Sequence, residues 1–172
     1  MKRSKFKISP PRIEQVNAEL LTVVSVFSRL TPNQRVCLVP YVHLRAYRTD
    51  ETIYEQGDPP AAVFFPLSGA IVLYHQEEAL RRDRIRTVSV GESCGRAALL
   101  PAAPQQESAV AAEPLQLLVL SHADFEMLTI RESAIATAIL QGVLEETLEE
   151  MRKAFTAYRG LTNHLTAANI IV

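Results

Sequence analysis

Residues 91–100 read Gly-Glu-Ser-Cys-Gly-Arg-Ala-Ala-Leu-Leu, and residues 106–110 read Gln-Glu-Ser-Ala-Val. The two glycines, Gly91 and Gly95, allow positive φ angles and a close approach of the backbone to a bound group. The short apolar turn that follows would point its first amide N–H groups toward the same place, as helix N-termini do when they bind anions. A plain corner between a strand and a helix would use the same residues. This stretch alone leaves both interpretations open.

Three motifs in the same order resemble those of the cyclic nucleotide-binding domain family, which includes the catabolite activator protein and the regulatory subunits of cyclic AMP-dependent kinase. Residues 91–100 align without a gap with the start of the family's phosphate-binding cassette, Gly-Asp-Phe-Phe-Gly-Glu-x-Ala-Leu-Leu. Residues 54–58, Tyr-Glu-Gln-Gly-Asp, match its Gln-Gly-Asp turn, and residues 66–72, Pro-Leu-Ser-Gly-Ala-Ile-Val, resemble its Leu-Ser-Gly-x-Val hairpin. The resemblance covers residues 27–158 and implies a β-roll that serves as a regulatory binding module. We call residues 91–110 the cassette segment.

The resemblance also implies where a ligand would bind. The family's glutamate, which accepts hydrogen bonds from the ribose, falls on Arg96, and its phosphate-binding arginine falls on Gln106 or Glu107. No lysine or arginine occurs between Ala97 and Ile130. Burying a phosphate without a counter-charge costs several kcal/mol. We therefore expect a sensor module that does not bind cyclic AMP or cyclic GMP in the family's manner. A cyclic nucleotide held in another way and another small anionic ligand both stay open. The cassette positions concerned are Gly95, Arg96, Ala97, Ala98, Gln106, Glu107, Ser108 and Ala109.

The composition limits the other classes of protein. A chain of 172 residues is one domain with tails, and its net charge of −1 argues against general nucleic-acid binding. No apolar run is long enough to span a membrane, and Ser9-Pro10-Pro11 stands where a signal peptide would be apolar. Cys37 and Cys94 lack metal-ligand spacing. These observations predict a cytoplasmic protein with no membrane contact.

The N-terminal region is predicted to be helical. Residues 1–12 form a basic lead that we expect to be disordered. Apolar residues from Ile13 to Phe27 have helical spacing, which predicts a helix. Thr31 followed by Pro32 is a helix start, and a short helix should extend to Leu38.

The middle of the chain predicts strands. From Tyr41 onward the apolar residues alternate, in short runs separated by turn residues, while residues 76–83 look like a charged loop. This pattern is typical of a mainly β domain with flanking helices, an antiparallel β-roll or jelly roll (a double-stranded β-helix). About eight strands are expected, among them residues 42–47, 52–54, 62–67, 70–75, 84–90, 108–112 and 115–120.

The C-terminal region predicts two helices. Ser121 is an N-cap for the first, and the second should begin near Arg131 and end at Gly160. The chain then divides into a lead (1–12), a β-roll with N-terminal helices (13–130), a C-terminal helix (131–160) and a tail (161–172). The twelve-residue tail is too short for a helix-turn-helix, so a DNA-reading domain is not expected. The long helix carries an apolar a/d seam of about two heptads, which predicts either a homodimer or packing on its own barrel; the seam is Leu144, Leu148, Met151, Phe155 and Tyr158.

Three further hypotheses follow from the residues. The basic cluster Arg81, Arg82, Arg84 and Arg86 could act with Arg96 as a substitute anion clamp. A ligand-free scaffold could use the fold to dimerise or to bind an unidentified protein, with Arg96 paired to Glu107 across an empty cassette. A cupin-like metal enzyme is the least supported alternative, because the four histidines are far apart in sequence and no nucleophile motif is present. We expect a protein that is not an enzyme and holds no metal.

Overall fold

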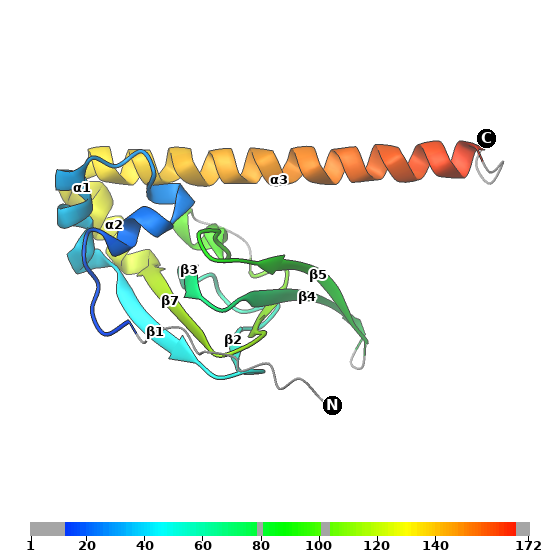
Figure 1. Ribbon diagram of the computed structural model, residues 1–172, viewed down its shortest axis with the longest axis horizontal. Coiled ribbons are helices and arrows are strands. Elements are labelled where there is room, and N and C mark those ends of the chain that lie inside the picture. Colours follow the sequence, from blue (N-terminus) through cyan, green and yellow to red (C-terminus); the bar gives the residue numbers. More distant parts are fainter. Residues whose placement is uncertain (1–12, 79–80, 101–103, 168–172) are drawn as a thin grey trace, which may run out of the picture.

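The described part of the chain contains seven strands in two antiparallel sheets. The computed structural model describes residues 13–78, 81–100 and 104–167. One sheet has the order β1-β7-β3 and the other β2-β6-β4-β5 (Figure 1). The predicted antiparallel β-roll is thus confirmed. The strands are β1 (His43–Tyr47), β2 (Thr52–Tyr54), β3 (Ala62–Ser68), β4 (Ile71–Glu78), β5 (Arg81–Val88), β6 (Ser108–Ala111) and β7 (Leu115–Ser121).

Helices flank the roll at both ends of the chain. Two predicted helix starts are confirmed: Thr31 forms a capping box with Gln34, and the Ser121 hydroxyl accepts a hydrogen bond from the Asp124 N–H at 3.0 Å. The elements are the 3₁₀ turns η1 (Leu20–Val23), η2 (Ser25–Phe27), η3 (Val39–Tyr41) and η4 (Arg96–Leu99), and the helices α1 (Pro32–Leu38), α2 (His122–Arg131) and α3 (Ser133–Ala167).

The helix expected over residues 13–27 is wrong, since only the two 3₁₀ turns form there. Val24 is extended between them, and β-branched residues around it disfavour a continuous helix. The Ile13 backbone instead exchanges two hydrogen bonds with the Gln116 side chain on β7, at 2.9 and 3.0 Å. Contacts with the sheet therefore override the helical spacing.

The charged loop expected over residues 76–83 is also wrong. β4 continues to Glu78 and β5 begins at Arg81, so the hairpin is longer than the alternation of apolar residues indicated. Its outer part aligns Gln76 with Arg82 and Glu78 with Arg81 across the two strands. The backbone pairing therefore extends beyond the apolar residues of the hairpin.

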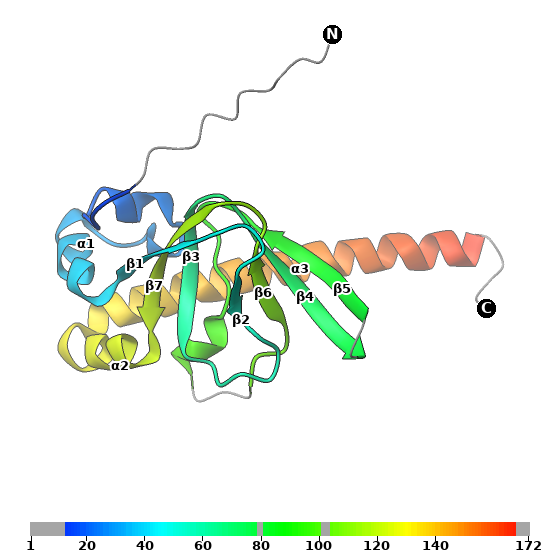
Figure 2. The ribbon, with the colours of Figure 1, turned by 90° about the horizontal axis from the view of Figure 1, so that it is seen from below.

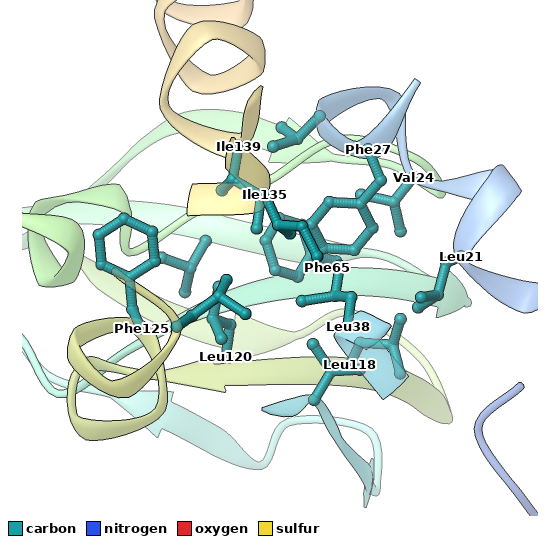
Figure 3. Close-up of a cluster of buried hydrophobic side chains, with 14 of the residues drawn as sticks. Leu21, Val24, Phe27, Leu38, Phe65, Leu118, Leu120, Phe125, Ile135 and Ile139 are labelled. Atoms are coloured by element: carbon teal, nitrogen blue, oxygen red, sulfur yellow. The ribbon is translucent and has the colours of Figure 1, made fainter. Parts of the chain in front are cut away.

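Strand β3 lies between two hydrophobic clusters and is buried along its whole length. Val63 and Phe65 face the helices, whereas Ala62 and Phe64 face the interior of the roll. The first cluster joins β3 and β7 to η2, α1, α2 and the start of α3 (Figure 3). Both sheet faces are therefore covered, which explains the unbroken apolar run of this strand.

Helix α3 runs along the roll, and its C-terminal part projects beyond the strands (Figures 1 and 2). The predicted end at Gly160 is wrong, because α3 continues to Ala167. A glycine inside a helix costs about 1 kcal/mol but does not by itself end it. The expected tail boundary at residue 161 therefore moves into the helix. Residues 1–12 and 168–172 lie outside the described residues.

The face of α3 that contacts the body changes character along the helix. Ile135 and Ile139 are buried in the first cluster, and Gly142 lies against η2. One turn farther on, the same face presents Glu146 and Glu150. The apolar half fixes the start of the helix, and the polar half reaches the cassette segment.

We expect Gly142→Ala to lower the free energy of unfolding by about 1–3 kcal/mol. A Cβ at residue 142 would lie 2.3 Å from the Val26 carbonyl oxygen, and backbone atoms must move to relieve that contact. Gly160→Ala is the matched control on the same helix, because nothing lies within 4 Å of its added Cβ. That variant should gain up to about 1 kcal/mol. Urea unfolding of both variants tests the contact, and equal effects would contradict it.

Candidate functional site

The first half of the cassette segment lies beside β3. The Phe64 N–H donates to the Cys94 carbonyl at 3.0 Å, and the Cys94 N–H donates to the Phe64 carbonyl at 3.1 Å. The Gly91 N–H donates to the Pro66 carbonyl, and its own carbonyl accepts from the Ser25 N–H. These bonds hold residues 91–95 between the roll and η2.

Gly95 begins the short turn η4 in the left-handed region, with φ of +71°. A Cβ there would lie 2.6 Å from the Ala62 carbonyl oxygen, so both the backbone angle and the space require glycine. The turn η4 has four residues, Arg96–Leu99. It is a 3₁₀ turn and not the longer helix whose N-terminus would bind an anion by itself.

A pocket of about 280 Å³ opens between η4 and the segment before β6. Five of the eight predicted site residues line it: Gly95, Arg96, Ala97, Gln106 and Glu107. The other three do not. Ala98 and Ala109 are fully buried in the two hydrophobic clusters, and the Ser108 hydroxyl accepts from the Gln56 N–H at 3.0 Å.

Sequence reasoning missed Pro104 and Gln105, which also line the pocket. Gln105 is buried, and its backbone exchanges hydrogen bonds with the turn at Gly57 and Asp58, at 2.8 and 2.9 Å. The motif at residues 54–58 thus anchors the far wall of the pocket. No local pattern in the sequence indicates Gln105, because these distant hydrogen bonds bring it to the pocket.

The burial of the two residues before β6 distinguishes the two candidates for the family's arginine position. Glu107 is half-buried, and its carboxylate lies near the hydroxyl of the buried Tyr54. Gln106 is exposed, and its side chain donates to the Pro104 carbonyl. Of the two residues left open by the sequence, the structure places Glu107 toward the interior.

Glu107 faces two buried groups, Tyr54 and Cys94. The Tyr54 hydroxyl oxygen lies 3.4 Å from Glu107 Oε1. Burial raises the pKa of the Cys94 thiol to about 12, while a hydrogen bond from Tyr54 acts in the opposite direction. Burial is also the main cause of the raised pKa of Tyr54, with further contributions from Cys94 and Glu107. The pocket wall is therefore neutral at Cys94 and carries a carboxyl group at Glu107, with the neutral Tyr54 hydroxyl beside that group.

Arg96 turns away from Glu107 and binds α3. Its Nη2 lies 2.5 Å from Glu150 Oε2, and its Nη1 donates to the Thr147 hydroxyl at 3.1 Å. Among the ion pairs of the described residues, Glu150 is the carboxylate partner of Arg96. The hypothesis of an Arg96–Glu107 pair is therefore wrong, because η4 presents Arg96 to the helix.

Two further contacts complete the attachment of α3. Arg86 on β5 lies 2.9 Å from Glu150 Oε1 and also donates to the Ser93 carbonyl at 3.1 Å. The Glu146 carboxylate accepts from the Ser93 N–H at 2.7 Å and from the Ser93 hydroxyl at 2.6 Å. Sequence reasoning missed both glutamates, because the register of α3 against the cassette cannot be seen in the chain. We call Ser93, Arg86 and Arg96 with Glu146 and Glu150 the α3 latch.

Of the four arginines in the basic cluster, two have described side-chain contacts. Arg86 belongs to the latch, and Arg84 donates to the Thr87 hydroxyl. The side chains of Arg81 and Arg82 lie outside the described ones.

A separate contact to α3 comes from Arg29, which pairs with Glu145, and this hydrogen bond lowers the pKa of Glu145.

The part of the chain that the structure describes contains no cluster of metal-ligating side chains that would support the metal-site hypothesis. No group of three or more histidine, cysteine, aspartate or glutamate side chains is placed there to hold an ion. His43 pairs with Asp124, and His122 Nδ1 lies 2.7 Å from the Ala98 carbonyl oxygen. Among the described helices, none has the length and apolar character needed to cross a membrane.

Comparison with known proteins decides the family. The model of the cyclic nucleotide-binding domain matches residues 44–132, which is more than half of the chain. The chain belongs to the cyclic nucleotide-binding domain family. Members of this family are regulatory binding domains.

Individual relatives agree with this assignment. A protein of Rhodopseudomonas palustris that carries the name of a potassium channel is 29% identical over 127 residues, which are 73% of this chain and 30% of that protein. The chain thus spans less than a third of that relative. A cyclic nucleotide-binding domain from Methylobacillus flagellatus superimposes with a TM-score of 0.71 at 19% identity, over 81% of this chain and 79% of the other. The catabolite activator protein of Thermus thermophilus gives 0.66 at 25% identity, over 78% and 63%.

As a cyclic nucleotide-binding domain, this chain keeps the glycines of the cassette and changes its charges. Gly91 and Gly95 have the positive φ angles that the turns require. Arg96 stands where the resemblance puts a glutamate, and Gln106 and Glu107 are the two residues on which it puts an arginine. The glycine framework of the cassette is retained.

We expect the two thiols to react at very different rates. Cys37 is exposed, whereas Cys94 is buried and, with a pKa of about 12, almost entirely protonated at pH 8. Because only the thiolate is nucleophilic, Cys37 should be alkylated at least about a thousandfold faster in the folded protein. Mass spectrometry after iodoacetamide pulses at pH 8 measures the ratio, and urea should abolish it. Comparable rates in the folded protein would contradict the burial of Cys94.

Proposed function

We propose that this domain is a regulatory module that does not bind cyclic AMP or cyclic GMP in the manner of its family. The observation that carries the proposal is the position of Glu107. Of the two residues on which the resemblance puts the phosphate-binding arginine, Glu107 is the half-buried one, directly before β6 and beside Tyr54. A cyclic phosphate placed there would lose a charge-assisted pair and meet a like charge.

Arg96 supports the same conclusion. The family's glutamate at this position accepts hydrogen bonds from the ribose, but a guanidinium has no acceptor. Arg96 is also already held by Glu150 and Thr147 on α3. Neither charged position is therefore available for the family's contacts.

Direct side-chain contacts join the cassette to α3, which suggests how the module would act. A signal can change the position of α3 only through a different affinity for its docked and undocked states. In this domain the docked state already has internal partners for Arg86, Arg96 and Ser93. The resting state is therefore the one with α3 docked. As a regulatory module, the domain would act by binding a ligand or a partner and not by catalysis.

Isothermal titration calorimetry with cyclic AMP and cyclic GMP tests the proposal. No heat is expected with either ligand up to about 1 mM, an affinity weaker than about −4 kcal/mol. A reference domain with the family's glutamate and arginine provides the positive control for the ligand solutions. Saturable binding at micromolar concentration would contradict the proposal.

A second function is favoured by the outer face of α3, namely dimerisation. The predicted seam of Leu144, Leu148, Met151, Phe155 and Tyr158 is between 42% and 66% exposed in the single chain. The latch glutamates occupy the opposite face, so docking of α3 leaves the seam outward. A homodimer through the seam is compatible with the regulatory proposal and would also serve a ligand-free scaffold.

A further inference from the structure

The latch contains two recognition sites for anions that the chain fills with its own carboxylates. The Glu150 carboxylate bridges two guanidinium groups, with Oε1 at 2.9 Å from Arg86 and Oε2 at 2.5 Å from Arg96. The Glu146 carboxylate accepts from both the N–H and the hydroxyl of Ser93. Forked arrangements of this kind also recognise phosphate oxygens.

The cationic half of the latch is shielded but not closed. The side chain of Arg96 is 17% exposed and that of Arg86 is 26% exposed. Arg96 also lines the cassette pocket, so a small molecule can approach it from that side. Two guanidiniums share one monovalent carboxylate at Glu150, and a divalent oxyanion would match their charge better.

We propose that Arg86, Arg96 and Ser93 form a binding site for a phosphate-type oxyanion, which binds only in exchange for Glu146 and Glu150 of α3. The anion and the docked helix then compete for the same donors. Binding would release the polar half of α3, while Ile135 and Ile139 keep its start in the hydrophobic core. This inference rests on the proposed function only in treating α3 as the element that responds.

The geometry determines the sign of the coupling. An oxyanion that takes the Nη2 groups of both Arg86 and Arg96 requires that Glu150 leave, since these are the donors it uses. A ligand that binds the undocked state alone shifts the helix toward that state. The exchange rate of backbone amides in α3 around residues 146–153 should therefore rise with ligand concentration.

The first test compares inorganic phosphate with sodium chloride at equal ionic strength. Hydrogen exchange of the wild-type protein should accelerate around residues 146–153 in phosphate at least about threefold more than in chloride, and exchange around Ile135 and Ile139 should stay unchanged. Equal exchange in the two salts would overturn the proposal. This comparison needs no variant and is independent of whether cyclic nucleotides bind.

The second test removes the internal competitor. In Glu146→Gln/Glu150→Gln the phosphate concentration at half-saturation, followed by the Ser93 amide resonance, should fall at least about tenfold, because neutral amides compete poorly with phosphate. The matched control is Glu149→Gln, an exposed residue of the same helix, which should leave the half-saturation unchanged. Equal half-saturation in the double variant and the wild-type protein would overturn the competition.

The third test removes the two arginines that are proposed to donate hydrogen bonds to the oxyanion. Arg86→Gln/Arg96→Gln should lose the response to phosphate at concentrations that saturate the wild-type protein, with a folded β-roll verified by circular dichroism. A retained response would overturn the assignment of the two arginines. If these tests fail and cyclic AMP does not bind, the oxyanion proposal is wrong and the proposed function stays intact. Micromolar binding of cyclic AMP would contradict the proposed function but not the oxyanion proposal.

Discussion

Replacing Glu107 with arginine is expected to raise the affinity of this domain for cyclic AMP at least about a hundredfold. The substitution removes a like charge from the phosphate position and adds a donor for charge-assisted hydrogen bonds, each worth about 1.5–3 kcal/mol. Glu107 lines the pocket directly before β6, so the new guanidinium would extend into the pocket. Calorimetric titration of the variant with cyclic AMP measures the gain.

Gln106→Arg is the matched control for this prediction. Gln106 is the neighbouring residue and lines the same pocket, but its side chain is exposed and donates to the Pro104 carbonyl. Its replacement should change the affinity less than about threefold, because added charge alone is screened by solvent. Glu107→Gln removes only the repulsion, so its affinity for cyclic AMP should lie between those of Gln106→Arg and Glu107→Arg. If Gln106→Arg gained as much as Glu107→Arg, the assignment of Glu107 to the arginine position would be wrong.

Arginine substitutions in the outward seam of α3 are expected to convert a dimer to a monomer. Leu148 and Phe155 are 42% and 62% exposed in the single chain, and burying such side chains in a seam contributes about 1.5–3 kcal/mol each. In Leu148→Arg/Phe155→Arg four charges would enter the interface of each dimer. We expect the dissociation constant to rise more than about a thousandfold.

Sedimentation equilibrium measures this change as a shift from twice the chain mass of 19.1 kDa to that mass. Ile130→Arg is the control, since Ile130 on α2 is 78% exposed and lies outside the seam. It should leave the association unchanged. A wild-type protein that sediments as a monomer at about 100 μM would contradict the dimer and leave the seam for another partner.

Dimerisation and the α3 latch use different faces of one helix, so the effect of the seam substitutions on the latch can be predicted. Glu146 and Glu150 face the cassette, whereas Leu148 and Met151 face outward. Substitutions in the seam should therefore leave the exchange of the latch amides unchanged in a monomeric protein. Coupling between the two faces would appear only through movement of the whole helix.

Local features of the chain determined much of the fold. Thr31 and Ser121 cap their helices as predicted, because capping depends on the residue and its next three neighbours. The alternation of apolar residues located the strands, since it reports which side of a sheet is buried. Gly95 marked a turn that only glycine can form in the space available.

Local pattern failed where distant parts of the chain supply the stabilising contacts. The helical spacing of residues 13–27 does not produce a helix, because Ile13 bonds instead to Gln116 on β7. Gly160 does not end α3, because a glycine lowers helix stability without preventing a helical backbone. The charged residues at the tip of the β4–β5 hairpin form paired strands once the partner strand is present.

The sequence by itself determined the family, the β-roll and the loss of the cassette's two family charges. Each of these depends on residue type and spacing along the chain. Only the tertiary structure decided that Glu107 and not Gln106 faces the interior, and that Arg96 binds Glu150 and not Glu107. These outcomes depend on the direction of side chains across a strand and on the register of α3 against η4. Contacts between residues more than fifty positions apart, such as Arg96 and Glu150, are set by how the elements pack, and no local pattern contains that information.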